Sequence, residues 1–326
     1  MVESRMTPII FAITAIIMRI GMYLSIGIQH KEYPTSFVWN IILPIFENEL
    51  LSLAFSTISV FFIAYIITQL NFRFSLIRFR TALPFSLIVF FLSLHPIFLP
   101  MSPNYLSIIL ILLAFFPLLQ SYQHTSPRNL AFESGVLIGL AGVFQIYTLA
   151  FLLLWWRGEI SMHGFNVKST FALILGAIFV FWNLAGFYFI FDNLHSFIER
   201  FTHFQNINLS IPDFSIIHWL LIGLSLFISI VFLMLDFKIF NRERVLAQKA
   251  FSFISLILVS SFVLHALYFL QTSSFLLLII IIMSYIMAHY YSHIKTRWQA
   301  YSFFIILLCS FVFFINSLID KPFIFS

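Results

Sequence analysis

Long apolar runs separated by short polar breaks dominate the pattern along the chain. A helix of roughly 18 or more apolar residues can cross a hydrocarbon core of about 30 Å. Runs of about this length occur at 7–28, 49–70, 81–100, 104–120, 132–156, 169–191, 215–236, 250–270, 275–292 and 301–319. A shorter run at 36–46 contains Pro44 and predicts an interfacial or re-entrant helix. The pattern predicts an all-α, polytopic transmembrane bundle that forms a single domain over residues 1–326.

The composition supports a membrane protein. Hydrophobic residues make up 61% of the chain, charged residues 9%, and the mean hydropathy is +1.03. A soluble domain carries about 25% charged residues, so the composition excludes a soluble enzyme or a nucleic-acid-binding domain. The single cysteine, Cys309, excludes an intramolecular disulfide. We expect the lipid bilayer to be the main partner and expect no nucleic acid.

The distribution of Lys and Arg decides how residues 132–156 cross the membrane, because these residues accumulate on cytoplasmic loops. If 132–156 is a single span, they divide almost evenly between the two sides. If the segment is a hairpin of two short helices, one side holds Lys31, Arg200 and Lys321, and the other holds Arg5, Arg73, Arg78, Arg80, Arg128, Arg157, Lys168, Lys238, Arg242, Arg244, Lys249, Lys295 and Arg297.

The sequence therefore predicts nine full spans, a re-entrant hairpin at 132–156, a cytoplasmic N-terminus and an extracytoplasmic C-terminus. The alternative is that 132–156 is one ordinary span and that Lys and Arg do not follow the cytoplasmic preference strictly. Gly135, Gly139 and Gly142 are expected to loosen the first arm of the hairpin.

Two predicted outer connectors carry most of the candidate chemistry. The first contains Glu32, Glu47 and Glu49, each of which could act as a general base or metal ligand or be an ordinary solvated acid. These three residues are the catalytic candidates.

The second connector contains Asp192, His195 and Glu199, spaced three or four residues apart. On a helix they would share one face and could hold a divalent metal ion. The same spacing is typical of an amphipathic helix that lies on the membrane surface. Both interpretations stay open.

Four basic residues are candidates for binding a substrate. Arg19 and His265 fall within apolar runs, and Lys31 and Arg200 lie in the outer connectors, where they could hold phosphate. An ionised side chain in hydrocarbon costs about 2.5–3.5 kcal/mol on insertion scales, so Arg19 must face the bundle or snorkel. A structural role for His265 is equally open. Neither has an evident acidic partner within the spans, which disfavours a proton-coupled transporter.

Several short motifs resemble a functionally uncharacterised family of bacterial polytopic inner-membrane proteins. The resemblance covers about residues 30–200 and rests on Pro34-Thr-Ser36, Arg80-Thr-Ala-Leu-Pro84, Ser93-Leu-His-Pro-Ile-Phe98, and Phe132-Glu-Ser-Gly-Val-Leu-Ile-Gly-Leu-Ala141 leading to Leu152-Leu-Leu-Trp155. It implies a location in the bacterial inner membrane.

The glycine-containing part of the last motif also resembles the re-entrant helix pair of polytopic (GT-C type) glycosyltransferases, which use lipid-linked sugars. That resemblance implies an acidic base or metal ligand in the first outer loop, which by position is Glu32, with Glu47 or Glu49 as alternatives. The chain departs from the pattern because that fold usually has Asp there, whereas no Asp precedes Asp192. It also lacks a large extracytoplasmic domain.

Two functions follow as hypotheses. The first is a glycosyltransferase-like enzyme that takes sugar from a polyprenyl-phosphate carrier on the extracytoplasmic face, with a divalent metal ion as a candidate cofactor. The alternative is a non-catalytic membrane subunit or scaffold that packs against other membrane proteins in an envelope or transport complex.

Overall fold

The computed structural model describes residues 6–28, 33, 35–79, 81–124, 127–203, 215–240, 242–268, 273–293 and 296–319. These residues form α1 (Thr7–Ile26), α2 (Trp39–Phe46), α3 (Glu49–Phe74), α4 (Leu83–Phe91), η1 (Pro96–Phe98), α5 (Pro103–Gln120), α6 (Arg128–Phe144), η2 (Ile146–Ala150), α7 (Phe151–His163), α8 (Val167–Ile190), α9 (Leu194–Thr202), α10 (Ile216–Phe240), α11 (Val245–Tyr268), α12 (Ser274–Ser292) and α13 (Arg297–Ile319).

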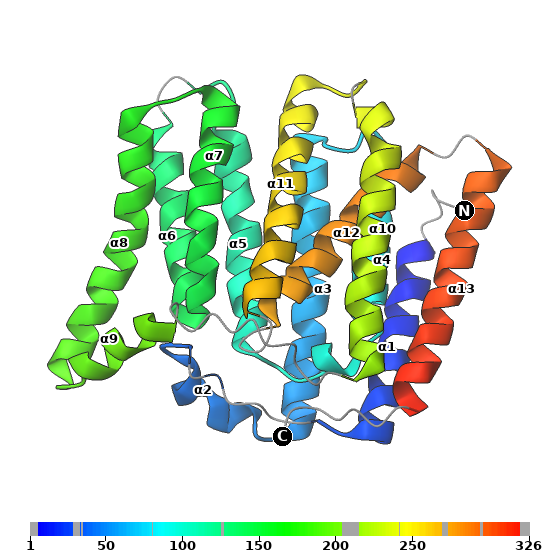
Figure 1. The fold of residues 1–326 in the computed structure, drawn as a ribbon, viewed down its shortest axis with the longest axis horizontal. Helices are drawn as coiled ribbons and strands as arrows, with labels where there is room; N and C mark the ends of the chain where they lie inside the picture. The colour runs from blue at the N-terminus through cyan, green and yellow to red at the C-terminus, as the bar shows by residue number, and fades with distance from the viewer. Residues whose placement is uncertain are drawn as a thin grey trace.

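Eight of these helices are long and apolar enough to cross a membrane: α1, α3, α5, α8, α10, α11, α12 and α13. The long helices lie roughly side by side, with α12 tilted among them (Figure 1). Helix α12 is the most buried and packs against α4, α5, α10 and α11. The predicted all-α polytopic bundle is confirmed.

The predicted hairpin is present. Helices α6 and α7 are antiparallel arms that begin and end at the same end of the bundle (Figure 1). The helix breaks at Gln145, whose backbone is extended (φ −147°, ψ 104°). The buried side chain of Gln145 accepts a hydrogen bond of 2.8 Å from Thr35 Oγ1, which ties the bend to the segment before α2. The charge distribution therefore predicted this topology correctly.

The glycines of α6 have a different role from the one expected. A Cβ atom on Gly135 would lie 2.0 Å from the backbone oxygen of Leu173, and one on Gly176 would lie 2.4 Å from that of Phe132. The missing side chains let the backbones of α6 and α8 approach closely, as small residues do in membrane helix pairs. These glycines pack the first arm tightly rather than loosen it.

The chain crosses the bundle at the predicted span 81–100, but not as one continuous helix (Figure 1). Helix α4 ends at Phe91, and the chain continues through η1 to the start of α5 at Pro103. His95 is extended (φ −134°, ψ 137°) because the residue before a proline is disfavoured in the helical region. The following Pro96 has no N–H to continue the helix. The described chain therefore has eight long spans, with α4 as a short, buried helix.

Two short helices lie across one end of the bundle (Figure 1). Helix α2 confirms the short helix predicted at 36–46. Helix α9 is amphipathic, and its Phe197 and Phe201 rings lie 5.4 and 5.7 Å from the ring of Phe37. The structure therefore favours the surface-helix interpretation of this segment.

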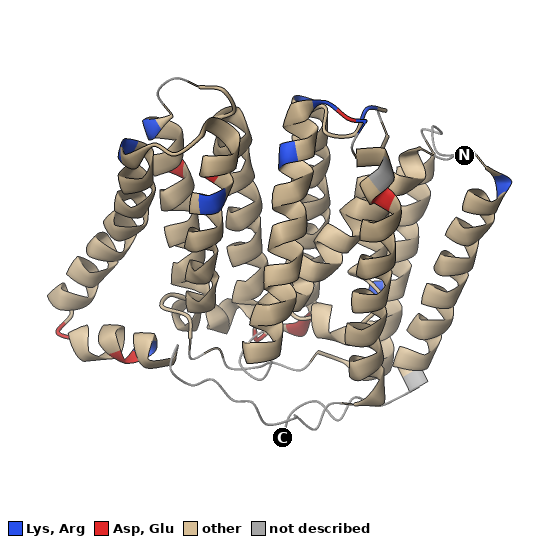
Figure 2. Ribbon diagram, turned by 45° about the horizontal axis from the view of Figure 1, so that its top comes forward, with Lys and Arg blue, Asp and Glu red and all other residues tan. Residues whose placement is uncertain are grey.

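The two ends of the bundle differ in charge (Figure 2). We call the end that holds the α6–α7 hairpin termini the basic end, and the end that holds α2 and α9 the opposite end. The described Lys and Arg residues near the basic end are Arg73, Arg78, Arg128, Arg157, Lys168, Arg242, Arg244, Lys249 and Arg297. Arg200 lies at the opposite end, and Arg19 lies inside the bundle.

Candidate metal centre

The ends of α10 and α12 bring four ionisable side chains together at the basic end. Helix α10 continues to Phe240, beyond the predicted run at 215–236, and Asp236 is fully buried in its last turns. The chain then turns, and the Glu243 N–H donates to the Phe240 carbonyl at 3.0 Å. His289 lies in the last turn of α12, and His293 follows it at the C-cap. Residues four apart on a helix share a face, so both imidazoles can reach one site.

Asp236 fixes the orientation of His289. The Nδ1 atom of His289 lies 2.7 and 2.8 Å from the two carboxylate oxygens of Asp236. The exposed fractions are 1% for His289 and 0% for Asp236, so water does not compete for this contact. Because a carboxylate accepts, Nδ1 is the donor, and Nε2 of a neutral imidazole then carries the lone pair. Histidines that bind metals are typically held by such a carboxylate contact.

His293 is held in the same tautomer by a different acceptor. Its Nδ1 atom lies 3.0 Å from the carbonyl oxygen of His289, which can only accept. Its Nε2 atom faces Glu243 Oε1 at 3.1 Å. In this tautomer the Nε2 lone pair faces the Glu243 carboxylate, an arrangement that a bound metal ion or a proton on Nε2 would stabilise; the Ser292 hydroxyl, 3.1 Å from Nδ1, is a second partner for that nitrogen.

Glu243, His289 and His293 each offer one ligand atom, and these atoms lie within 4.8 Å of one another. Ligands bound at about 2.0–2.2 Å to one tetrahedral ion are about 3.4 Å apart. The more distant ligand atoms would therefore have to move closer by about an ångström, through side-chain rotation, for all three to bind a single ion. We call these three residues, together with Asp236, the metal centre.

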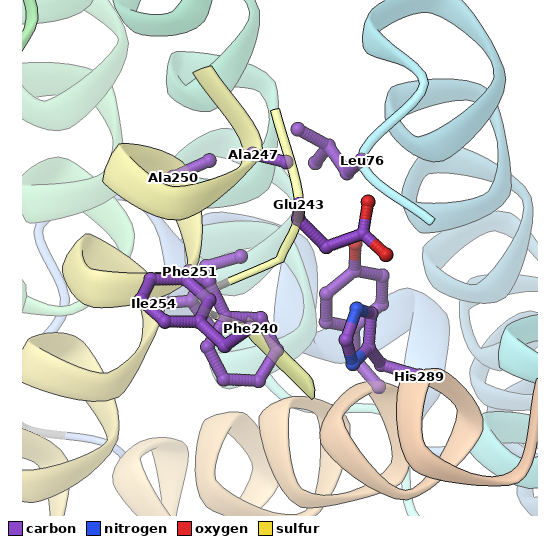
Figure 3. Close-up of a pocket in the computed structure, with 9 residues that line it drawn as sticks. Leu76, Phe240, Glu243, Ala247, Ala250, Phe251, Ile254 and His289 are labelled. Carbon is purple, nitrogen blue, oxygen red and sulfur yellow. The ribbon is translucent and has the colours of Figure 1, made fainter. Parts of the chain in front are cut away.

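A narrow hollow adjoins the centre and, as packed in this structure, has no room for a water molecule. Glu243 from the α10–α11 connector and His289 from α12 point toward each other across it (Figure 3). Phe240, Phe251 and Ile254 close the apolar side. Glu243 and His293 are half-buried, so the centre is reached from the basic end while His289 and Asp236 stay enclosed.

The donor set indicates the kind of ion. Two imidazoles and one carboxylate suit zinc and neighbouring transition metals rather than calcium or magnesium, which prefer oxygen ligands. Three protein ligands leave a coordination position open for water or substrate, as in catalytic zinc sites. The arrangement could therefore polarise a substrate oxygen or activate a water molecule.

The predicted catalytic carboxylates do not belong to this centre. Glu47 and Glu49 are exposed at the corner between α2 and α3, at the opposite end. Asn48 between them caps α3 by accepting from the N–H groups of Leu50 and Leu51 at 3.0 and 3.3 Å. Glu32, the positional match to the glycosyltransferase pattern, and Lys31 lie outside the described residues.

The predicted metal ligands at the opposite end are not gathered. Asp192 lies before α9 in a left-handed turn (φ 52°), so it does not continue the helical face of His195 and Glu199. All three side chains are exposed. Among the described residues, the three that meet within metal-binding distance are those of the metal centre.

The candidate Arg19 is buried and bound within the fold. Its Nε donates to Thr57 Oγ1 at 2.9 Å, and Nη2 donates to Ser56 Oγ at 2.6 Å and to the Phe98 carbonyl at 2.9 Å. Its Nη1 reaches the Leu92 carbonyl at 3.4 Å. These carbonyls belong to the break after α4, so Arg19 supplies the donors that the missing helix would have provided.

The other two described candidates also lie away from the centre. The Arg200 guanidinium donates to the Phe37 carbonyl at 2.9 Å and to the Tyr188 hydroxyl, and it stacks over the Phe37 ring at 5.2 Å. It joins α9 to α8 and to the segment before α2. His265 is buried in the last turn of α11, toward the opposite end.

The sequence analysis missed the metal centre, although part of its signal was present. His289 and His293 form an i, i+4 pair at the end of an apolar run, which is typical of metal-binding helices. Asp236 is the last residue of the predicted run at 215–236, and the sequence does not show that it is buried. Its burial in α10 removes one of the grounds on which a transporter was disfavoured.

Comparison with known proteins adds no assignment, because no family model, curated protein or solved structure matches the chain.

Proposed function

We propose that this protein is a metal-dependent enzyme of the membrane, with its metal centre at the cytoplasmic face. The observation that carries the proposal is the set of His289, His293 and Glu243, with Asp236 holding His289. A zinc ion bound there would supply a Lewis acid with an open coordination position. The centre lies at a membrane face, which favours a substrate whose polar group is attached to a lipid.

The cytoplasmic assignment belongs to the proposal. It rests on the accumulation of Lys and Arg at the basic end, because such residues mark cytoplasmic loops. We place the protein in the bacterial inner membrane, following the family resemblance of residues 30–200. Tags inserted at Gly164 and after Glu243 should be inaccessible from outside intact cells. Labelling of either tag from outside would reverse the assignment.

Metal analysis of the purified protein tests the centre. After incubation with Zn²⁺ and removal of excess metal, the wild type should retain about one ion per chain. The His289→Ala and His293→Ala variants should lose it, since each removes one ligand. His124→Ala is a matched control, because His124 is an exposed histidine that follows the end of α5. Equal retention by all four proteins would contradict the metal centre.

The enzyme part of the proposal has its own test. Mass spectrometry of lipids from cells that make either the wild type or His293→Ala should show a precursor that accumulates only in the variant. Identical lipid profiles, with the metal bound in the wild type alone, would instead favour the non-catalytic subunit or scaffold.

A second candidate is the glycosyltransferase-like enzyme on the extracytoplasmic face. The observation that favours it is the hairpin of α6 and α7, with its bend next to the segment before α2. Glu32→Gln, Glu47→Gln and Glu49→Gln test it one by one. If at least one variant loses glycoconjugates while metal binding at the basic end is unchanged, this candidate is favoured. If all three match the wild type, it is wrong.

A further inference from the structure

Helix α11 separates two hollows. Ala247, Ala250, Phe251 and Ile254 face the cavity beside the metal centre. The other face of α11 and the hairpin arm α7 line a groove of about 320 Å³, formed by Arg157, Ser161, Ser252, Phe253, Ser255, Leu256 and Val259. We call this the α7–α11 groove. None of its lining residues belongs to the metal centre.

The groove is polar toward the basic end and apolar toward the middle of the bundle. Helix α7 runs toward the basic end and α11 runs away from it (Figure 1). A Cβ atom on Gly158 would lie 2.7 Å from the Phe253 ring. Gly158 of α7 and Phe253 of α11 are therefore at the same depth in the bundle. Ser161 and Ser252 therefore lie nearer the basic end, and Leu256 and Val259 lie deeper. At a rise of about 1.5 Å per residue, Ser252 lies about 10 Å from the start of α11 at the basic end.

Arg157 brings a positive charge to the groove without an acidic partner. It is exposed, and none of the ion pairs among the described residues includes it. The acidic side chain nearest in sequence, Glu159, is buried and accepts from Ser169 Oγ at 2.6 Å. An uncompensated charge within the membrane is costly, so Arg157 favours an anion from the surroundings.

The donor chemistry of the groove matches phosphate. A guanidinium binds phosphate oxygens in pairs, and hydroxyl groups add further donors. The lining supplies Arg157 and the hydroxyls of Ser161 and Ser252, and no carboxylate; the Ser255 hydroxyl also lines the groove but donates to the Phe251 carbonyl at 2.8 Å. Lys249, three residues before Ser252, is not part of the lining, and its Nζ lies over the Tyr122 ring at 5.1 Å.

We propose that the α7–α11 groove binds the phosphate of an anionic phospholipid from the leaflet at the basic end. The phosphate lies against Arg157, Ser161 and Ser252, and an acyl chain follows Leu256 and Val259. The site is separate from the metal centre and does not depend on the proposed enzymatic function.

Binding of dioleoyl phosphatidic acid to the full-length protein in detergent, measured by native mass spectrometry, tests this site. Arg157→Gln should weaken binding about tenfold or more, and the Ser252→Ala/Ser255→Ala double variant should weaken it several-fold. Arg157→Lys should fall between these and the wild type, because it keeps the charge but not the paired donors. Arg297→Gln, which changes an exposed arginine at the same end, should bind as the wild type does.

Two ligand controls identify the source of the phosphate. Dioleoylglycerol has the same chains without phosphate and should not bind at the same concentration. Inorganic phosphate should displace the lipid only at much higher concentration, because it lacks the chains. The proposal is overturned if dioleoylglycerol binds equally, if inorganic phosphate displaces the lipid at equal concentration, or if Arg297→Gln weakens binding as much as Arg157→Gln. Metal content should be unchanged in every variant, which separates this test from that of the metal centre.

Discussion

The two ends of the bundle use charged side chains in different ways. At the opposite end, Arg200 is bound to the backbone of its neighbours, and Glu47 and Glu49 are exposed to the surroundings. At the basic end, Asp236 is fully buried against an imidazole, and Glu243 faces a second imidazole. A carboxylate in water is stable without a partner, whereas a buried carboxylate requires one. The comparison is the reason for proposing the buried, paired carboxylates of the basic end, rather than the exposed ones, as the functional site.

The largest effect on stability is expected from Arg19, whose charge is buried and holds the fold together. Arg19→Ala removes the donors to Ser56 and to the Leu92 carbonyl, and an orphaned buried acceptor costs about 1–3 kcal/mol. The Phe98 carbonyl, in contrast, keeps the Tyr105 hydroxyl as a donor. Because the substitution also leaves a cavity, we expect the free energy of unfolding to fall by about 2–5 kcal/mol. Thermal unfolding in detergent measures this loss, with the exposed Arg297→Ala as the control. An unfolding temperature within the range of the control would show that Arg19 does not support the break after α4.

A smaller effect is expected from the residue that orients His289. Asp236→Asn keeps the size of the side chain but removes the charge that holds Nδ1 as a donor. Such contacts are worth about 10–100-fold in metal affinity, so Zn²⁺ affinity should fall by that factor. Competition with a chromophoric chelator measures the change. Asp192→Asn, an exposed aspartate at the opposite end, should have no effect, and an equal loss in both variants would contradict the role of Asp236.

Acidification should weaken metal binding at the basic end. Protons compete with the metal for both imidazoles and the carboxylate, so binding must release protons. Zn²⁺ affinity should therefore decrease as the pH is lowered, and calorimetry in buffers of different ionisation enthalpy should detect the protons released. Affinity that does not change with pH would be incompatible with histidine ligands.

The smallest effect on stability is expected from the exposed carboxylates of the opposite end. Glu47→Gln and Glu49→Gln remove charges that lie in solvent-accessible positions, and such substitutions usually change stability by less than about 0.5 kcal/mol. Thermal unfolding should match that of the wild type. A substantial loss in either variant would indicate a buried role for the corner between α2 and α3.

Hydropathy and charge predicted most of the fold because each is a property of a continuous segment. The eight long spans follow from run length, and the hairpin of α6 and α7 follows from the sidedness of Lys and Arg. The break after α4 was missed because run length ignores breakers inside a run, although His95 and Pro96 lie in the run at 81–100. The stabilisation of the break by Arg19, more than 70 residues away in the chain, could not be read from run length either.

The metal centre was harder to predict than the spans. His289 and His293 are visible as a pair, but their carboxylates come from the end of another helix, 53 residues before His289 in the case of Asp236. The sequence does not show that the ends of α10 and α12 meet. At the opposite end, the spacing of Asp192, His195 and Glu199 satisfied a helical pattern, but the helix begins only at Leu194.

Anomalous X-ray scattering at the zinc edge from crystals of the zinc-loaded protein tests the metal centre most directly. We predict a single strong peak bounded by Nε2 of His289, Nε2 of His293 and the Glu243 carboxylate, at about 2.0–2.2 Å from each. A peak beside His195 and Glu199 at the opposite end, or no peak between α10 and α12, would contradict the account.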